Sequence, residues 1–494
     1  MGNKFLLAID QGTTSSRAMI FSHLGEALHQ HQIDLKQSYP EDGWVEQDPE
    51  EIWINTYTCC QEVLKKMKLS AKNIAAIGIS NQRETTIMWD KKSGQPIYPA
   101  IVWQDRRTSA LCKELSEHPI HKTLQEKTGL LLDPYFSATK IMWLLKNVSG
   151  AREKAERGEL LFGTVDTFLL WRLTQGKSHA TDASNASRTL LFNIRTQQLD
   201  KDILEALEIP ENILPTVLDS SANFGETDRE LFGEKIPITG IAGDQQAATV
   251  GQACFSPGMI KSTYGTGCFM LLNTGSLFVQ SKNRLLTTIA YRLKNKVTYG
   301  LEGSIFCAGA TIKWLRDSLK LIKTAQETEE LAKEVSDTGG VYLVPAFTGL
   351  GAPHWDPLAR GALIGLTRNS NVNHIVRAAL EAVCYQTEDL LHAMAKDGVT
   401  QIKTLRVDGG MVANNWLLQF LADTLNLTVA RAKCVETSAL GAALLAGLQV
   451  GIFDSLDQIA ALWQSDAEYK PQMEPAVRQN LYEGWQRAIN RIIS

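Results

Sequence analysis

Residues 5–21 read FLLAIDQGTTSSRAMIF, and this stretch decides both the fold and the kind of ligand to look for. An apolar run ends at Asp10, a hydroxyl-rich turn follows, and a second apolar run covers Ala18–Phe21. Two strands around such a turn predict a β-hairpin whose tip carries backbone N–H groups, hydroxyls and the cation Arg17. That tip suits a polyphosphate, and Asp10 at the strand end suits its divalent metal. A polar surface hairpin without a ligand explains the same stretch.

Length and composition limit the class of protein. At 494 residues the chain is too long for one hydrophobic core, so we expect two or more domains. The formal net charge of -4 provides no basic surface, and no nucleic-acid partner is expected. The longest apolar run, Ala439–Val450, is well short of the ~20 residues that span a bilayer, so membrane insertion is not expected. The 8 cysteines are scattered without a C-x-x-C pair, which is typical of a reducing compartment, and a cytoplasmic enzyme is predicted.

The rest of the N-terminal part alternates between strands and helices. Helical spacing over Pro49–Lys68 precedes a buried-type strand at Ile74–Ile79, which leads into the polar cluster Ser80–Thr86. This alternation predicts an α/β domain, in which residues just beyond the carboxyl end of a strand are a common ligand site. We also expect a hairpin around residues 182–193 and a surface loop over residues 220–235.

A second unit is predicted to begin near residues 236–241 and to repeat the design of the first. Met259–Asn273 reads as strand, Gly-Thr-Gly turn and strand, with one hydroxyl at Thr266. Two α/β halves, each with a Gly/Thr hairpin tip, predict a duplicated fold with a nucleotide between the halves. The glycines of the second tip also fit a tight turn that requires positive φ. Residues 453–494 look helical, charged and structural.

A second candidate for nucleotide binding lies in residues 405–425. A strand ends at Asp408, two glycines make the turn, and a helix with one apolar face follows. The glycines allow a flat ring to lie against the backbone. Asn414 near the helix start either hydrogen-bonds a base edge or acts only as the N-cap of the helix.

Asp244 and the adjacent pair Arg83–Glu84 are candidate groups for an acceptor substrate. Asp244 follows a strand and a glycine-containing turn, where a carboxylate acts as a general base or stabilises a helix N-terminus. An arginine beside a glutamate can donate to and accept from vicinal hydroxyls, although such a pair also occurs as a solvated edge. Three aromatic residues are candidates to pack against the carbon atoms of a small polyol: Trp103, Tyr135 and Phe269.

Together these motifs resemble the FGGY family of carbohydrate kinases, within the actin, hexokinase and Hsp70 ATPase superfamily. The likeness runs from Phe5 to about Gly451, and two family signatures fit without gaps, at Tyr135–Asn147 and Gly361–Glu381. It is carried in chain order by IDQGTTSSRA, NQRETT, DPYFSATKIMWLLKN, GDQQAA, TYGTGCFML and RVDGGMVANN. The resemblance implies an α/β fold of two duplicated actin-like (ribonuclease H-like) domains with the active site in the cleft between them. The implied domains are residues 1–250, on the acceptor and phosphate side, and residues 251–494, on the nucleotide side.

The resemblance also implies a role for individual residues. ATP and Mg²⁺ are the expected nucleotide and metal, with Asp10 near the metal. The expected nucleotide contacts are Thr13, Thr14, Ser15, Arg17, Thr266, Gly309, Lys313, Gly410 and Asn414. The expected acceptor contacts are Arg83, Glu84, Trp103, Tyr135, Asp244, Gln245 and Phe269, with Asp244 as the general base. Lys313 departs from the glutamine that is common at this position in family members that act on glycerol.

The motifs NQRETT, DPYFS and GDQQAA are similar to the acceptor pocket of family members that phosphorylate glycerol. The implied reaction is ATP plus glycerol giving ADP and sn-glycerol 3-phosphate. A family member acting on xylulose or ribulose is the second interpretation. A non-kinase ATPase of the actin or Hsp70 type is the third, and it leaves Arg83–Glu84 and DPYFS unexplained. The family further implies a homodimer or homotetramer.

Overall fold

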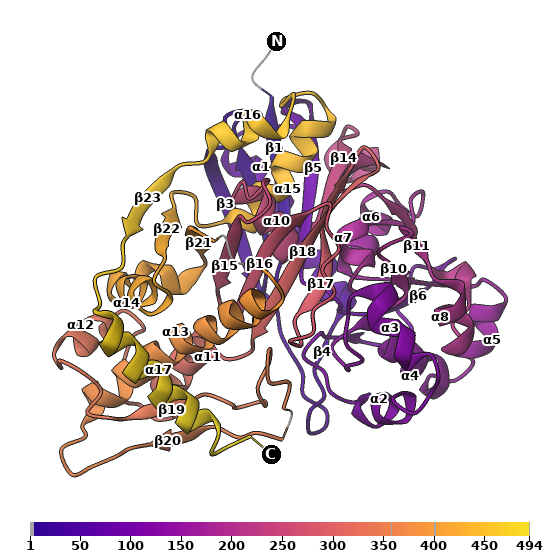
Figure 1. Ribbon diagram of the computed structural model, residues 1–494. Helices are drawn as coiled ribbons and strands as arrows, with labels where there is room; N and C mark the ends of the chain where they lie inside the picture. The colour runs from indigo at the N-terminus through magenta and orange to yellow at the C-terminus, as the bar shows by residue number, and fades with distance from the viewer. Residues whose placement is uncertain (1–3, 357, 400–401, 494) are drawn as a thin grey trace.

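Two mixed β-sheets form the centres of two α/β halves in the computed structural model, which describes residues 4–356, 358–399 and 402–493 (Figure 1). The first sheet contains β1 (Phe5–Gln11), β2 (Ser15–Phe21), β3 (Ala27–Asp34), β5 (Ile74–Asn81), β13 (Ser221–Glu226) and β14 (Pro237–Gly243). The second contains β15 (Ile260–Tyr264), β16 (Cys268–Gly275), β17 (Leu286–Leu293), β18 (Lys296–Ile305), β21 (Thr404–Asp408), β22 (Thr428–Ala432) and β23 (Ser465–Tyr469).

The two sheets share one strand order, apart from the additional edge strand β17 of the second. The first runs β13-β14-β5-β1-β2-β3 and the second runs β17-β18-β16-β15-β21-β22-β23. In each, an antiparallel hairpin comes first, and two later strands add in parallel on the side of its first strand. Parallel strands require long crossovers, and these crossovers contain the helices. The repeated order confirms the duplicated α/β fold with two actin-like halves.

Helices cover the sheets and build a lobe on the N-terminal half. That half contains α1 (Pro49–Lys66), α6 (Val165–Leu173), α9 (Arg229–Phe232), α10 (Asp244–Gly251) and the lobe helices α2 (Ser109–Leu115), α3 (His121–Thr128), α4 (Ser137–Asn147), α5 (Ala151–Glu156), α7 (Ala183–Ala186) and α8 (Lys201–Ala206). The C-terminal half contains α11 (Gly309–Asp317), α12 (Glu327–Lys333), α13 (Val372–Lys396), α14 (Asn415–Leu425), α15 (Thr437–Gln449), α16 (Leu456–Leu462) and α17 (Pro475–Ile489). Figure 1 shows α2, α3, α4, α5 and α8 together at one side of the molecule.

Short strands and 3₁₀ turns complete the connections. The strand pairs are β4 (Glu46–Gln47) with β7 (Ala100–Ile101), β6 (Ile87–Asp90) with β8 (Leu160–Gly163), β9 (Ala180–Asp182) with β12 (Thr216–Leu218), β10 (Phe192–Asn193) with β11 (Gln198–Leu199), and β19 (Tyr342–Val344) with β20 (Ala362–Ile364). The 3₁₀ turns cover Ala71–Asn73, Glu211–Ile213 and Gly410–Ala413.

Helices α10 and α15 join the two halves. α15 follows β22 of the second sheet but packs on β1, β5 and β14 of the first, whereas α10 contacts β15 and β16 of the second (Figure 1). A Cβ atom added at Gly441 of α15 would lie 1.8 Å from the carbonyl oxygen of Ala247 in α10. One added at Gly251 would lie 2.1 Å from the carbonyl oxygen of Thr437. Only glycine permits these backbone contacts, so two glycines hold the halves at their closest approach.

The opening hairpin, the helix over residues 49–68 and the strand over residues 74–79 are confirmed. β1 and β2 pair antiparallel with Asp10 opposite Arg17. Pro49 begins α1, and the preceding Asp48 accepts a hydrogen bond from the Glu50 N–H at 2.9 Å. Proline at the first helical position after an aspartate cap is a strong helix start, which explains why this boundary is readable from the sequence.

The expected hairpin around residues 182–193 is wrong. Residues 183–186 form helix α7, because the Asp182 carboxylate accepts hydrogen bonds from the N–H groups of Ser184 and Asn185, each at 2.9 Å. This is an N-cap, and it starts a helix where a turn was expected. The hairpin of this region lies later, where β10 pairs with β11.

Three longer-range expectations are also wrong. Residues 220–235 are not a surface loop, since β13 pairs there with β14 and buries Phe224. Residues 237–243 do not begin the second unit but form β14 of the first sheet. Residues 465–469 of the tail form β23 on the second sheet rather than a helix. In each case the segment pairs with a strand that lies outside the unit to which the sequence assigned it: β13 with β14, β14 with β5, and β23 with β22.

The eight cysteines, all among the described residues, are free, and seven of them are buried. Cys434 alone is half-buried, and the buried cysteines serve as small apolar residues of the core. Within the described ranges, no helix is both long and apolar enough to cross a membrane.

Candidate active site

The tip of the β1–β2 hairpin is held by side chains from three other segments. Gln82 donates to Gln11 Oε1 at 3.1 Å and to Gln47 Oε1 at 2.8 Å. Gln47 donates in turn to the carbonyl oxygen of Thr13 at 2.6 Å, and the Trp103 indole donates to Thr13 Oγ1 at 2.8 Å. These hydrogen bonds fix the turn that contains the predicted phosphate residues Thr13, Thr14 and Ser15. Thr14 is exposed.

Arg17 on β2 is bound to protein groups in this structure. Its guanidinium donates to Gln32 Oε1 at 3.0 Å and forms an ion pair with Glu436, which precedes α15 of the C-terminal half. Asp10 lies opposite Arg17 at the end of β1. Burial raises the pKa of Asp10 to about 6, and the neighbouring Arg17 opposes that rise.

A cavity of ≈ 420 Å³ lies between the second hairpin tip, α11 and the start of α14. Its lining includes five of the predicted nucleotide contacts, Thr266, Gly309, Lys313, Gly410 and Asn414. A Cβ atom added at Gly309 would lie 2.6 Å from the carbonyl oxygen of Gly265, so the tip and α11 touch through backbone. The structure brings this part of the predicted site together from residues far apart in the chain.

Asn414 has the capping role that was one of its two interpretations. Its Oδ1 accepts from the Leu417 N–H at 2.9 Å, and its Nδ2 donates to Thr328 Oγ1 at 3.3 Å. It also lines the cavity, so the cap does not exclude a contact with a ligand. Thr328 and Glu329 at the start of α12 line the same cavity, and no motif in the sequence marked them.

Arg83 and Glu84 lie buried at the end of β5, with exposures of 3% and 1%, so they are not a solvated edge. Arg83 Nε lies 3.3 Å from Asp244 Oδ1, and the two carboxylate oxygens of Glu302 accept from the Arg83 η nitrogens. Glu84 has φ of 59°, a left-handed backbone conformation that is strained for a non-glycine residue. Such strain is concentrated at functional sites.

Asp244 begins α10 directly after β14, at the carboxyl ends of the parallel strands. Its Oδ1 accepts from the N–H of Gln245 at 2.7 Å, and its side chain keeps an exposed fraction of 29%. Burial raises the pKa of Asp244 above its ordinary 3.8, and the positive charges of Arg83 and Lys261 oppose that rise. The carboxylate is thus held by protein groups and still partly exposed to solvent.

Three aromatic side chains flank these charges. The ring centroids of Trp103 and Tyr135 are 5.7 Å apart, and those of Trp103 and Phe269 are 5.9 Å apart. The Arg83 guanidinium lies 5.7 Å from the centre of the Phe269 ring. Phe269 comes from β16 of the C-terminal half, so residues of both halves enclose this acceptor pocket.

Four polar atoms of the acceptor pocket have no hydrogen-bond partner among the described residues. In Glu84 and Asp244 one carboxylate oxygen accepts from protein and the other does not, and Gln245 accepts from Lys261 through Oε1 at 2.5 Å. The atoms left over are Glu84 Oε2, Tyr135 OH, Asp244 Oδ2 and Gln245 Nε2. None of these four belongs to the buried side-chain atoms that lack a partner, so each is accessible and free to hydrogen-bond a polar ligand.

Comparison with known proteins identifies the family. Models of the FGGY family of carbohydrate kinases match the chain in two parts, the N-terminal domain at residues 5–251 and the C-terminal domain at residues 260–450. The chain belongs to the FGGY family of carbohydrate kinases.

Relatives of this FGGY kinase match it over its whole length. The glycerol kinase of Coxiella burnetii (strain RSA 493 / Nine Mile phase I) is 61% identical and covers 100% of this chain and 98% of its own. The crystal structure of Plasmodium falciparum glycerol kinase with ADP superposes with a TM-score of 0.92 at 39% identity, covering 100% and 99% of the two chains. A xylulose kinase from Lactobacillus acidophilus, at 21% identity and a TM-score of 0.87 over 99% and 98% of the chains, shows the shared fold alone.

Several charged residues of the acceptor pocket were missed in the sequence. Arg188 donates to Glu84 Oε1 at 2.7 Å, Glu302 binds Arg83, and Lys261 binds Gln245. All three are fully buried. The signal was present, because each is a charged residue within or beside an apolar stretch, but only the fold shows which partners they meet.

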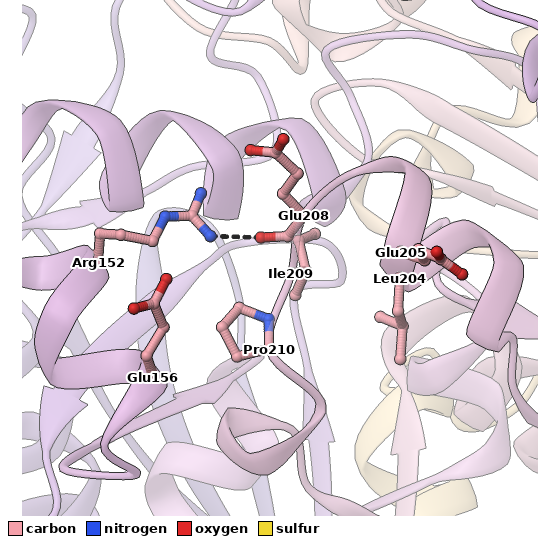
Figure 2. Close-up of a pocket in the computed structure, with 7 residues that line it drawn as sticks. All are labelled: Arg152, Glu156, Leu204, Glu205, Glu208, Ile209 and Pro210. Atoms are coloured by element: carbon pink, nitrogen blue, oxygen red, sulfur yellow. Dashed lines mark hydrogen bonds between the residues drawn. The ribbon is translucent and has the colours of Figure 1, made fainter.

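A second pocket is separate from this site. Figure 2 shows it, an open hollow of ≈ 620 Å³ at α5 and α8 in which Arg152 donates to the carbonyl oxygen of Glu208. Its lining residues are Arg152, Glu156, Leu204, Glu205, Glu208, Ile209 and Pro210. It contains none of the predicted site residues of the FGGY kinase.

Proposed function

We propose that this FGGY kinase transfers the γ-phosphoryl group of ATP to a terminal hydroxyl of glycerol, producing sn-glycerol 3-phosphate and ADP. The observation that carries the proposal is the acceptor pocket, in which four polar atoms without a protein partner in the described ranges lie beside three aromatic rings. The set contains two carboxylate oxygens that accept hydrogen bonds, an amide nitrogen that donates them and a phenol that does both, as a small polyol requires. The glycerol kinases among the full-length relatives support the same acceptor.

The charge of the acceptor pocket also favours a neutral acceptor. Arg83, Arg188 and Lys261 supply three positive charges, and Glu84, Asp244 and Glu302 supply three negative ones. A balanced pocket has no spare cation for an anionic sugar acid. An uncharged polyol leaves that balance intact.

Asp244 acts as the general base in this proposal. The acceptor hydroxyl oxygen attacks the γ-phosphorus, Asp244 Oδ2 takes the hydroxyl proton, and the bond from the γ-phosphorus to the β-phosphate oxygen breaks to release ADP. Such transfer depends on positioning and charge stabilisation more than on covalent help. Arg17, Thr13, Thr14 and Ser15 supply donors at the phosphate end once Arg17 leaves Glu436.

The nucleotide lies in the cavity lined by Thr266, Gly309, Lys313, Gly410 and Asn414 in this proposal. Mg²⁺ fits the partly buried carboxylate of Asp10, because carboxylate oxygen is a ligand type that this ion prefers. No cluster of three His, Cys, Asp or Glu side chains suited to a metal occurs in the described ranges, so phosphate oxygens would complete the ligand set. Bound there, Mg²⁺ would neutralise phosphate charge.

An acceptor survey tests the proposal. Purified protein with Mg²⁺ and ATP is assayed for ADP release with glycerol, D-xylulose, D-ribulose or no acceptor. We expect stimulation by glycerol alone, with sn-glycerol 3-phosphate identified by a stereospecific dehydrogenase. Stimulation by a ketopentose instead would favour the second interpretation, and slow turnover indifferent to any acceptor would favour the third.

Three further properties are proposed on the family resemblance alone. They are a homodimeric or homotetrameric assembly, a cytoplasmic location, and domain boundaries at residues 1–250 and 251–494. Light scattering on the purified protein measures the first, and separate expression of residues 1–250 and 251–494 as folded fragments addresses the third.

A further inference from the structure

Four buried charges form a closed ring beneath the acceptor pocket. Glu302 accepts from Arg83 through Oε2 at 2.5 Å and through Oε1 at 3.1 Å, and its Oε1 also accepts from Arg188 Nη2 at 2.9 Å. Arg188 Nε donates to Glu84 Oε1 at 2.7 Å, and that oxygen lies 3.9 Å from Arg83 Nε. The side chains of all four residues are at most 2% exposed. Two members of the ring, Arg83 and Glu84, are the predicted acceptor contacts.

The ring crosses the boundary between the two halves. Arg83 and Glu84 follow β5, and Arg188 follows α7, all in the N-terminal half. Glu302 lies inside β18 of the second sheet, opposite Leu271 of β16 and Leu286 of β17. An acidic side chain in the middle of a buried strand is costly unless it is paired, and its partners here belong to the other half.

The contacts leave particular atoms for a ligand. Arg83 donates through both η nitrogens to Glu302, and its Nη1 also donates to Gln246 Oε1 at 3.2 Å. The third nitrogen of the guanidinium, Nε, donates no hydrogen bond to the described residues. It lies 3.3 Å from Asp244 Oδ1. In the same way, Arg188 occupies Glu84 Oε1 and leaves Oε2 unpaired. Burial alone would raise the pKa of Glu302, but Arg188 and Arg83 lower it to about 2, so Glu302 stays ionised at neutral pH.

We propose that Arg188 and Glu302 are positioning residues for the acceptor, which orient Arg83 and Glu84 so that one donor and one acceptor face vicinal hydroxyls. This inference rests on the proposed glycerol kinase activity. Glu302 fixes the rotation of the Arg83 guanidinium, and Arg188 fixes that of the Glu84 carboxylate. Because Glu302 comes from the C-terminal half, affinity for the acceptor depends on contact between the halves even without nucleotide.

The test uses the full-length variants Glu302→Gln and Arg188→Lys. Glu302→Gln keeps the shape of the side chain but removes its charge, and Arg188→Lys keeps the charge but lacks the fork that reaches Glu84 and Glu302 together. We expect the KM for glycerol to rise roughly 10–100-fold in each, with the KM for ATP within about 3-fold of wild type. The Kd for glycerol without nucleotide, followed by intrinsic tryptophan fluorescence and by calorimetry, should rise in parallel.

Glu381→Gln is the matched control. Glu381 is also a buried glutamate paired with an arginine, at 2.8 Å from Arg377 Nε, but it lies on α13 away from the acceptor pocket. It should lower Tm without changing the Kd for glycerol. Loss of glycerol affinity in this variant as well would show that general destabilisation, not the ring, is responsible.

The double variant Arg188→Gln/Glu302→Gln separates positioning from loss of charge balance. It removes one positive and one negative charge, so it should fold at least as well as either single change. Restored stability with glycerol affinity still reduced supports positioning by the ring. Glycerol KM and Kd unchanged in the folded single or double variants would overturn the inference while wild-type turnover with glycerol still stands. Absence of glycerol-dependent turnover in the wild type would instead refute the proposed function.

Discussion

Asp244 and Arg83 meet at the carboxyl ends of neighbouring parallel strands, with Asp244 Oδ1 3.3 Å from Arg83 Nε. The arginine steadies the ionised carboxylate, while the second oxygen of Asp244 faces the cleft. This arrangement gives a base that is oriented by protein groups and still partly exposed. It provides the geometric basis for the first predictions.

Replacing Asp244 with asparagine should lower kcat by roughly 10²–10⁴-fold, the usual contribution of a positioned base. Asparagine keeps the shape of the side chain and cannot take the hydroxyl proton. Nucleotide affinity, measured by equilibrium titration with ADP, should stay within about 3-fold of wild type. Turnover equal to wild type would remove Asp244 from the chemical step.

The pH dependence of kcat should reflect the same carboxylate. Burial raises the pKa of Asp244 above 3.8, so the base loses activity on the acid side at a higher pH than an exposed aspartate would. Because only the ionised form accepts a proton, kcat should fall as the pH decreases through the raised pKa of Asp244. The residual activity of Asp244→Asn should lack this acid limb, and an identical limb in both proteins would assign it to another group.

Arg83→Lys should separate the two substrates. Lysine keeps the charge but cannot bind Glu302 through two nitrogens while a third faces the acceptor. We expect the KM for glycerol to rise about 10-fold or more and the KM for ATP to change by less than about 3-fold. Equal increases in both constants would indicate a structural role for Arg83.

Gly309→Val should give the opposite pattern. A Cβ atom at this position would lie 2.6 Å from the carbonyl oxygen of Gly265, so the second hairpin tip or α11 must shift. The KM for ATP should rise about 10-fold or more, because both segments line the cavity, while the Kd for glycerol stays near that of wild type. A normal KM for ATP in a folded variant would argue that the nucleotide lies elsewhere.

Glu388→Gln should stabilise the protein at alkaline pH. Burial, followed by the charge of Asp389, raises the pKa of Glu388 to about 8 from 4.5, against the opposing Arg478, and its Oε2 is buried without a partner. Between those two values folding takes up a proton, so stability present below pH 4.5 is lost as the pH rises toward 8. Relative to wild type, the Tm of the variant should be roughly 2–4 °C higher at pH 8 and nearly equal at pH 5.

The control for this experiment is Glu330→Gln, a glutamate with a side chain exposed fraction of 74%. Its Tm difference from wild type should be small and should not grow between pH 5 and pH 8. If the Tm gain of Glu388→Gln over wild type is no larger at pH 8 than at pH 5, Glu388 ionises in the folded protein at its ordinary pH and the raised pKa is refuted.

Local signals in the sequence predicted much of the fold. The apolar runs on either side of residues 11–16 predicted the β1–β2 hairpin, and the helical spacing over Pro49–Lys68 predicted α1. These features depend on neighbours along the chain, so propensity and capping suffice to find them. Helix α7 was missed because Asp182 caps a helix too short to show periodicity, and β13 was missed because its stability comes from β14.

The candidate site divides in a similar way. The opening stretch marked Asp10, Thr13 and Arg17 because a phosphate site needs a tight turn rich in donors, and that pattern is contiguous. Asp244 and the pair Arg83–Glu84 were visible as polar residues after strands, but each alone fitted a cap or a solvated edge. Burial decided between these alternatives for Arg83 and Glu84.

By itself, the sequence determined the two α/β halves, their hairpin tips and the resemblance to the FGGY family, because these depend on contiguous patterns. Only the tertiary structure decided which charges meet. Glu302 reaches Arg83 and Arg188 because β18 of one half abuts the strand ends of the other, and α15 packs against α10 because Gly441 lets the two helix backbones touch. Buried charges gain their stability from partners, and a partner in another half of the chain leaves no mark in the local sequence.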